Sequence, residues 1–257
     1  MKERIAFLIT EYVREYPKNK RIRPLWGEPL VAYASAHDPQ FYKLKNIVSP
    51  THALPPDLLT DARSVIAYFI PFVQEVNISN ISGRDASRLW AETYIATNQL
   101  IFDLNGHLQE YLSAEGHEGA SVPATHNFDE EKLISDWSHR HVAFIAGLGT
   151  FGVNNMLITA RGCCGRIGSL VTNLEIPPSK KEAGEHCLAR HDGSCYKCVD
   201  RCVNEALFAN SYDRWKCYEM CLYNDNLFPD LGVVDVCGKC LVGVPCSTAN
   251  PVKQQNN

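Results

Sequence analysis

The sequence predicts a mixed α/β domain followed by a small cysteine-rich module. Three observations predict this order. One continuous apolar run has the length and β-branched content of a buried strand, and a later stretch repeats apolar side chains at helical spacing. Nine of the eleven cysteines then lie between Cys187 and Cys246. With 257 residues, the chain is long enough for one sizeable α/β core over 1–180 and a module with a short tail over 181–257.

The elements of the expected core follow from apolar periodicity and from helix-breaking residues. Pro17, Pro71 and Gly116 mark the ends of three of them. In chain order we expect a helix over 2–16, loop with short elements over 18–60, a strand over 64–72, helices over 85–115 and 129–146, strands over 156–159 and 167–175, and a linker from Pro177.

Composition and charge narrow the class of protein. Hydrophobic residues make up 45% of the chain and charged residues 21%, and the formal net charge is −4. This balance is that of an ordinary globular protein, and it predicts neither a membrane surface nor a nucleic-acid partner. No apolar run reaches the ~18 residues of a membrane span. The first residues lack the features of a signal peptide, so we expect a cytoplasmic protein whose cysteines stay reduced.

The cysteine spacing predicts two iron–sulfur clusters. Cys195, Cys198 and Cys202 have the C-x2-C-x3-C spacing of a ferredoxin run, with the first ligand displaced to Cys187 by an insertion. Cys237, Cys240 and Cys246 form a second run, and its missing ligand is expected at Cys217. Because ferredoxin runs exchange their last ligands, one cluster is assigned to Cys187, Cys195, Cys198 and Cys246, and the other to Cys202, Cys217, Cys237 and Cys240.

Alternatives stay open for the cysteines. Four-cysteine zinc sites also use C-x2-C pairs. Cys221 lies four residues after Cys217 and could replace it as a ligand, although a buried free thiol is the simpler expectation. Cys163 and Cys164 lie far upstream and are expected to be small buried side chains.

A glycine-rich loop joins the second helix to the next strand. Gly147, Gly149 and Gly152 satisfy G-x-G-x-x-G, but a dinucleotide fingerprint follows a strand and opens a helix. Here the order is helix, loop, strand, which disfavours nicotinamide binding. The glycines allow positive φ and close approach of a ligand, and a tight turn packed on the core is the alternative.

Three features in order carry a family resemblance: the A-G-L-G-x-x-G loop within 137–159, the T-x-L segment within 168–175, and the two cysteine groups. Together they resemble the epoxyqueuosine reductase family, over about residues 65–250. They are also similar to the corrinoid domain of reductive dehalogenases.

The resemblance implies a nitroreductase-like core that holds a base-off cobalamin over the glycine loop, followed by a ferredoxin-like module with two [4Fe–4S] clusters. The clusters would pass electrons to the corrinoid. The corrinoid would then lie along Gly147, Leu148, Gly149, Gly152 and Asn154. We expect a reductase of an unknown small molecule, supplied by a low-potential donor of the ferredoxin or flavodoxin type. The alternative is an iron–sulfur electron-transfer or corrinoid-activating protein without turnover of its own.

The catalytic candidates follow from departures within the same stretch. Members of the family have an acidic proton donor at a position that aligns nearest Leu133 of this sequence, and Asp136 lies one helical turn away from it. The glutamate that the family usually has on this helix is replaced near His139. We therefore expect Asp136, His139 and His141 to supply the proton donor. The helical-repeat tail that helps relatives to grip tRNA has no counterpart in this sequence, which together with the negative charge predicts a substrate other than tRNA. Arg161 and Arg166 could meet corrin carboxamides or an anionic substrate.

Overall fold

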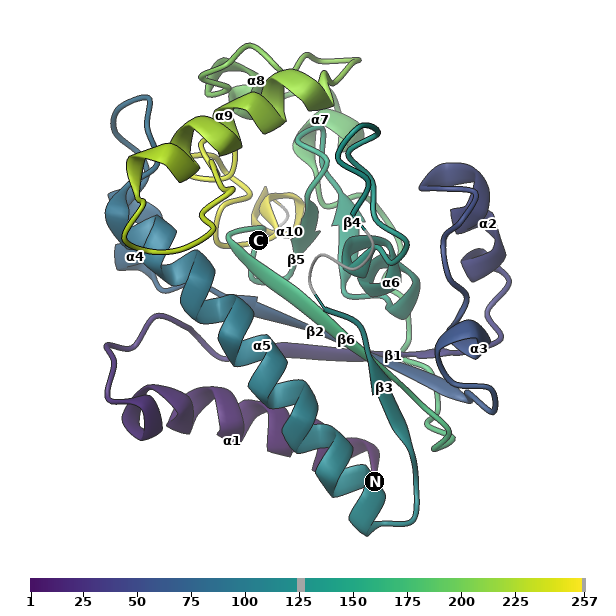
Figure 1. The fold of residues 1–257 in the computed structure, drawn as a ribbon. Coiled ribbons are helices and arrows are strands. Elements are labelled where there is room, and N and C mark those ends of the chain that lie inside the picture. Colours follow the sequence, from purple (N-terminus) through teal and green to yellow (C-terminus); the bar gives the residue numbers. More distant parts are fainter. Residues whose placement is uncertain (124–127, 256–257) are drawn as a thin grey trace.

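The centre of the protein is a four-stranded antiparallel sheet, seen in a computed structural model that describes residues 1–123 and 128–255 (Figure 1). The strand order is β1-β2-β6-β3. The strands are β1 (Leu30–Ser35), β2 (Ser64–Pro71), β3 (Gly119–Ser121) and β6 (Gly165–Thr172).

Helices cover both faces of this sheet, and every residue of β2 is therefore buried. Ile66, Tyr68 and Ile70 alternate toward one face, where α1 (Lys2–Lys20) and α5 (Arg88–Ala114) pack. Val65, Ala67 and Phe69 point to the opposite face, where α2 (Gln40–Ile47) and α6 (His139–Ala146) pack. This two-sided burial explains why the strand sequence is continuously apolar instead of alternating.

The cysteine-rich segment lies across one end of this core, with α7, α8 and α9 at the top of Figure 1. Backbone bonds attach it to the loop before β6: Cys163 N donates to Cys246 O at 2.9 Å and Cys164 N to Ser247 O at 3.0 Å. In the part of the chain that is described, no helix is long and apolar enough to cross a membrane. The remaining elements are α3 (Pro55–Leu58), α4 (Gln74–Ser79), β4 (Gly149–Phe151), β5 (Leu157–Thr159), α7 (Leu188–His191), α8 (Lys197–Asp200), α9 (Arg214–Leu227) and α10 (Pro251–Gln255).

The structure confirms the mixed α/β class, the buried strand β2 and the long helix α5. The expected end of α1 at Pro17 is wrong, because the helix continues to Lys20. Pro17 is buried, and its carbonyl still accepts a hydrogen bond from Ile22 N at 2.9 Å. Its ring therefore removes one donor without ending the helix. Strand β1 lies within the region expected to be loop, and its pairing with β2 supplies the stability that its short sequence does not signal.

The helix expected over 129–146 is only half formed. Residues before Ser138 form a turn in which Asp129 and Ile134 make an antiparallel bridge and Leu133 has a φ of 52°. The Asp129 carboxylate accepts bonds from the backbone N–H groups of residues 131 and 132, which competes with helix formation. Helix α6 therefore begins only at His139, after the buried Trp137.

The sheet is tightly packed where Tyr68 of β2 pairs with Gly168 of β6. The Tyr68 ring crosses over Gly168, and its hydroxyl donates to Asn105 Oδ1 of α5 at 2.8 Å. A Cβ on Gly168 would come within 2.3 Å of that ring.

We expect Gly168→Ala to lower the free energy of unfolding by about 1–3 kcal/mol, because the tyrosine must move out of its packed position. The matched control is Gly106→Ala in the middle of α5, where an added Cβ meets no atom within 4 Å. That substitution should stabilise the helix by about 0.5–1 kcal/mol. Urea denaturation of both variants measures the difference. Equal effects would contradict the packing described here.

Candidate functional site

Four thiols from both ends of the cysteine-rich segment line one small cavity of about 20 Å³. We call them the distal thiol set: Cys187, Cys195, Cys198 and Cys246. Burial and the three neighbouring thiols raise the pKa of Cys198 to about 12. Thiols held this close resist ionisation, and a bound cationic metal centre would supply the charge that lets them become thiolates.

A second cavity of about 140 Å³ is lined by the other four predicted ligands. We call them the proximal thiol set: Cys202, Cys217, Cys237 and Cys240. Burial also raises the pKa of Cys237, to about 11, and the Cys217 and Cys202 thiols add to the shift. The folded chain therefore brings together the same two groups of four cysteines that the crossed ferredoxin pattern pairs. In residues 1–123 and 128–255, no three His, Cys, Asp or Glu side chains lie close enough to hold one metal ion.

The three remaining cysteines surround these sets. Cys221 lines the proximal cavity and shares a hydrogen bond with Cys217, so the two stay alternative ligands. Cys163 and Cys164 are both buried, as expected. The Cys164 thiol donates to Leu241 O at 3.1 Å, and Cys163 contacts Cys246 of the distal set.

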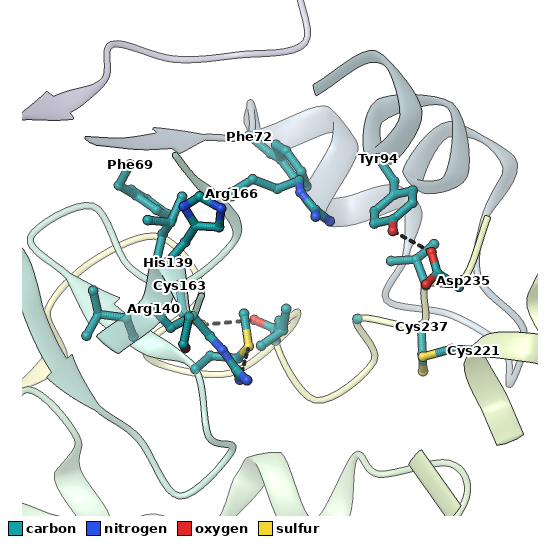
Figure 2. A pocket seen from close by; sticks show the side chains of 18 of the residues that line it. Phe69, Phe72, Tyr94, His139, Arg140, Cys163, Arg166, Cys221, Asp235 and Cys237 are labelled. Carbon is teal, nitrogen blue, oxygen red and sulfur yellow. Dashed lines mark hydrogen bonds between the residues drawn. The ribbon is translucent and has the colours of Figure 1, made fainter. Parts of the chain in front are cut away.

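A larger cavity of about 450 Å³, the central cavity, opens beside the proximal set. The two cavities have six lining residues in common: Arg140, Met156, Cys221, Cys237, Gly238 and Leu241. Aromatic side chains form much of the wall, namely Phe69, Phe72, Trp90, Tyr94 and Trp137. Figure 2 shows His139 and Arg166 on one side of this cavity, and Cys221 and Cys237 on the other.

Two polar groups of the central cavity lack a hydrogen-bond or ion-pair partner among the described residues. The Arg166 guanidinium lies over the Tyr94 ring, 4.4 Å from the ring centroid, and no carboxylate of the described residues pairs with it. The one acidic side chain of the wall, Asp235, accepts the Tyr94 hydroxyl instead. Trp90 is 2% exposed, and its Nε1 has no hydrogen-bond partner among the described residues. Unpaired donors in a cavity wall favour a ligand that presents acceptor oxygens.

The three predicted catalytic residues do not come together. His139 lines the central cavity, with its Nδ1 2.8 Å from Ser169 Oγ and its Nε2 3.5 Å from Pro123 O. His141 faces a different cavity, where its Nδ1 lies 2.7 Å from Ser138 Oγ. Asp136 accepts a bond from Thr51 Oγ1 at 2.5 Å, and its carbonyl accepts from Ala53 N at 2.8 Å. It does not line any of the cavities described here.

The glycine loop is explained by contacts within the protein. Gly147 ends α6 with a φ of 90°, and a Cβ on Gly149 would come within 2.1 Å of Ile158 O, across the β4–β5 pair. Gly152 and Asn154 line the distal cavity, and a Cβ on Gly152 would meet the Asn154 side chain at 2.6 Å. None of these residues, nor Leu148, lines the central cavity. Their contact with a corrinoid stays a prediction.

A fourth cavity, of about 850 Å³, adjoins the central cavity at Ser135, Ser138, Arg140 and Cys221. We call it the arginine cavity, because Arg140, Arg190 and Arg214 line it and no acidic side chain does so among the described residues. Its wall also carries several aromatic rings: Phe128, His141, Phe151, Tyr212 and Tyr218. Cations beside exposed aromatic faces are the combination that binds nucleotide phosphates and stacks bases.

Sequence reasoning did not identify Trp90, Tyr94 or the three arginines of that cavity. Arg140 stood between the two candidate histidines, but Arg190 and Arg214 come from separate parts of the chain. Only the packing of the cysteine-rich segment on α6 brings them together. Arg161, by contrast, lies outside the central cavity and pairs with Glu28 at 2.6 Å.

Burial lowers the pKa of His139 to about 4, and Arg166 contributes to the shift. The unfolded chain then takes up a proton near pH 6.5, before the folded one. The contribution of neutral, buried His139 to the free energy of unfolding is therefore full above pH 6.5 and declines as the pH falls toward 4. Between pH 7 and pH 5.5, we expect native protein to lose about 1 kcal/mol more than His139→Gln does. Anaerobic denaturant titrations measure this, with the exposed His37→Gln as control. A loss that is the same in all three proteins would contradict a buried, neutral His139.

Comparisons with known proteins come from sequence and from structure. No family model matches the chain. An epoxyqueuosine reductase of Bacillus anthracis is 25% identical over 183 residues, which are 67% of this chain and 43% of that protein. The structure of epoxyqueuosine reductase from Bacillus subtilis, solved with a catalytic loop swung out of the active site, matches with a TM-score of 0.57 and 18% identity. That match covers 94% of this chain and 66% of the solved one.

Another epoxyqueuosine reductase structure matches with a TM-score of 0.56 and 18% identity, and again covers 94% of this chain and 66% of the solved one. That protein is in complex with a tRNA stem loop modified with epoxyqueuosine. This finding corrects the expectations that a nucleic acid is an unlikely partner and that the substrate is a small molecule. Net charge was a poor basis for these expectations, because it averages over the whole surface and does not exclude a local group of arginines.

The chain spans less than half of the curated relative and about two thirds of the solved chains. The similarity to reductive dehalogenases stays a prediction. Sequence and structure comparisons thus both confirm the resemblance to the epoxyqueuosine reductases, whose fold this chain shares.

Proposed function

We propose that this chain is an oxidoreductase that uses two [4Fe–4S] clusters and a cobalamin to reduce epoxyqueuosine in tRNA. The observation that carries the proposal is the juxtaposition of two four-thiol cavities with the central cavity. Electrons delivered to the proximal set reach the central cavity across residues that line both. The similarity to epoxyqueuosine reductases supports the choice of substrate.

In this proposal the chain has a nitroreductase-like core over 1–180 and a ferredoxin-like module over 181–257. The antiparallel sheet with helices on both faces supports the first, and the crossed grouping of the thiols supports the second. The distal and proximal thiol sets would each hold one cluster.

The central and arginine cavities together are suited to a large, flat macrocycle with amide side chains. The aromatic walls supply apolar contact, and the unpaired Arg166 and Trp90 Nε1 supply donors for carboxamide oxygens. A bound cobalamin would supply the low-potential metal that reduces the epoxide. The prediction that Gly147, Leu148, Gly149, Gly152 and Asn154 contact the corrinoid is kept as part of this proposal; none of these residues lines the central cavity.

The chain's own groups position the substrate and manage protons. Reduction of an epoxide consumes two electrons and two protons, so a proton source must lie near the reacting carbon and oxygen atoms. Of the three predicted candidates, His139 lines the central cavity. Because its pKa is about 4, it is neutral near pH 7 and would act as a hydrogen-bonding group there. Asp136 and His141 do not line the central cavity, so they would donate a proton only to a substrate that extends beyond it.

The arginine cavity is the proposed entry for the tRNA loop. Its three guanidinium groups would bind phosphates, while its aromatic rings would stack against bases. With a tRNA substrate, the protein would be located in the cytoplasm, where tRNA is found. The exposed Trp215 ring lies beside Arg214 of this cavity and adds to its aromatic surface.

The first test is turnover. Protein reconstituted anaerobically with iron, sulfide and cobalamin, and reduced with a low-potential donor, is expected to remove one oxygen atom from an epoxyqueuosine stem loop, as measured by mass spectrometry. Cys198→Ala should lose about half of the iron and most of the turnover, because one of two clusters is lost.

Cys221→Ala is the matched control, since it removes a neighbouring thiol of the proximal cavity. It should keep both clusters if Cys217 is the ligand. Protein that binds both cofactors and leaves every stem loop unchanged would reject the reductase and favour the corrinoid-activating alternative. Colourless protein that contains zinc and no iron would reject both.

The second test is RNA binding. Arg190→Gln and Arg214→Gln should each weaken stem-loop binding by about 1 kcal/mol and lower the salt slope by about one unit, because each removes one phosphate contact. Fluorescence anisotropy at several salt concentrations measures both quantities. Arg4→Gln, on an exposed part of α1, is the control. If all three variants bind like native protein, the arginine cavity is not the RNA site.

A further inference from the structure

The two cysteine runs share a short motif whose lysines have opposite surroundings. The first run contains Cys195-Tyr-Lys197-Cys198, and the second contains Cys237-Gly-Lys239-Cys240. Lys197 is exposed, whereas Lys239 is only 1% exposed. The same sequence position therefore holds a solvated charge beside the distal set and a buried charge beside the proximal set.

The residue before each lysine causes this difference. Gly238 has a φ of 72°, and a Cβ there would come within 2.3 Å of the Trp90 ring. Only glycine combines that conformation with so close an approach, so the second run can turn inward. The equivalent Tyr196 has a φ of −127°, and its side chain is exposed.

The buried ammonium group is held by carbonyl oxygens. Lys239 Nζ donates to Asn80 O at 2.9 Å and to Ser82 O at 2.8 Å. Asn80, itself fully buried, donates from Nδ2 to Cys237 O at 2.9 Å, which ties the same loop to the proximal set. Arg201 completes the clamp by donating to Lys239 O at 3.1 Å and to Ile81 O at 2.8 Å.

No carboxylate of the described residues lies within ion-pair distance of Lys239. Asp85, whose charge acts on Lys239, pairs with Arg84. The Lys239 and Cys237 charges do interact with one another. Among the described residues the positive charge of Lys239 is thus paired with no acid, and Lys239 lines the proximal cavity together with the thiols that would hold a cluster.

We infer that Lys239 makes the proximal cluster the more easily reduced of the two, and so directs electrons from the distal set toward the central cavity. The inference rests on the two clusters of the proposed function. A [4Fe–4S] cluster that takes up one electron gains one negative charge, which a nearby buried cation stabilises. Water and salt screen the exposed Lys197, so the distal cluster lacks this stabilisation. Lys239 would not touch the cluster or a substrate; its electric field would raise the reduction potential of the proximal cluster.

The experiment is an anaerobic redox titration with dithionite as the one-electron donor, followed by EPR. Native protein should show two clusters that are reduced at different potentials. The signal that remains in Cys198→Ala, which keeps the proximal set, should be the one reduced at the higher potential. Two clusters with the same potential, or a remaining signal at the lower one, would overturn the inference.

The matched substitutions are Lys239→Met and Lys197→Met. We expect Lys239→Met to lower the equilibrium constant for reduction of one cluster about tenfold, a shift of about 59 mV for a one-electron couple. Lys197→Met should change it less than about twofold, because its charge is screened. Lys239→Arg keeps the charge and should restore most of the native potential. Equal potentials in Lys239→Met and native protein would overturn the inference.

Iron analysis separates this result from the proposed function. A native preparation without iron overturns the clusters and the inference with them. Native protein with two clusters and no difference between their potentials overturns the inference alone. If Lys239→Met loses iron, Lys239→Gln replaces it in the titration, because glutamine keeps a donor for the carbonyls without the charge. The comparison of the two cluster potentials in native protein tests the inference in either case.

Discussion

The return of the cysteine-rich segment onto the α/β core is the constraint on which the site depends. Cys163 and Cys164, in the loop before β6, donate their backbone N–H groups to Cys246 and Ser247. These bonds hold the end of the second cysteine run against the core. The first run can then close over it, so that Cys246 joins Cys187, Cys195 and Cys198 in one cavity. Cys246, the fourth member of the distal set, is therefore held in place by this attachment.

The same attachment creates the two larger cavities. Residues 235–238 and Leu241 form one wall of the central cavity, and residues of β6 and α6 line it from the other side. A segment that carries the proposed cluster ligands is therefore also a wall of the space in which we propose that reduction occurs. Gly238 is important for both roles, because its contact with Trp90 seals that wall and its conformation turns Lys239 inward. Local charge matters more than net charge in this arrangement. A chain of net charge −4 places three arginines and no acid around one cavity among its described residues.

Much of the fold could be predicted from local pattern. The eight buried residues of β2 and the apolar stripe of α5 carry periodic signals strong enough to place both elements. The helix expected over 129–138 does not form, because the Asp129 carboxylate accepts hydrogen bonds from the N–H groups of residues 131 and 132 and because Trp137 is buried in the core. The turn at Asp129 is a local hydrogen-bond effect, whereas the burial of Trp137 depends on partners distant in sequence. Apolar periodicity contains neither. The close approach of Gly149 to Ile158 on the paired strand likewise comes from tertiary structure, and the contact of the glycine loop with a corrinoid stays a prediction.

By itself, the sequence determined the class of chemistry and the family resemblance. Cysteine spacing is a local property, and the short reach of a thiol limits which cysteines can meet around one cluster. Only the tertiary structure decided which side chains share a cavity. It separated His139 from His141, joined Arg140 to Arg190 and Arg214, and buried Lys239 while leaving Lys197 in water. The physical reason is that burial and electrostatic field at a side chain come from the elements packed around it, so two motifs that differ in one residue can have opposite electrostatics.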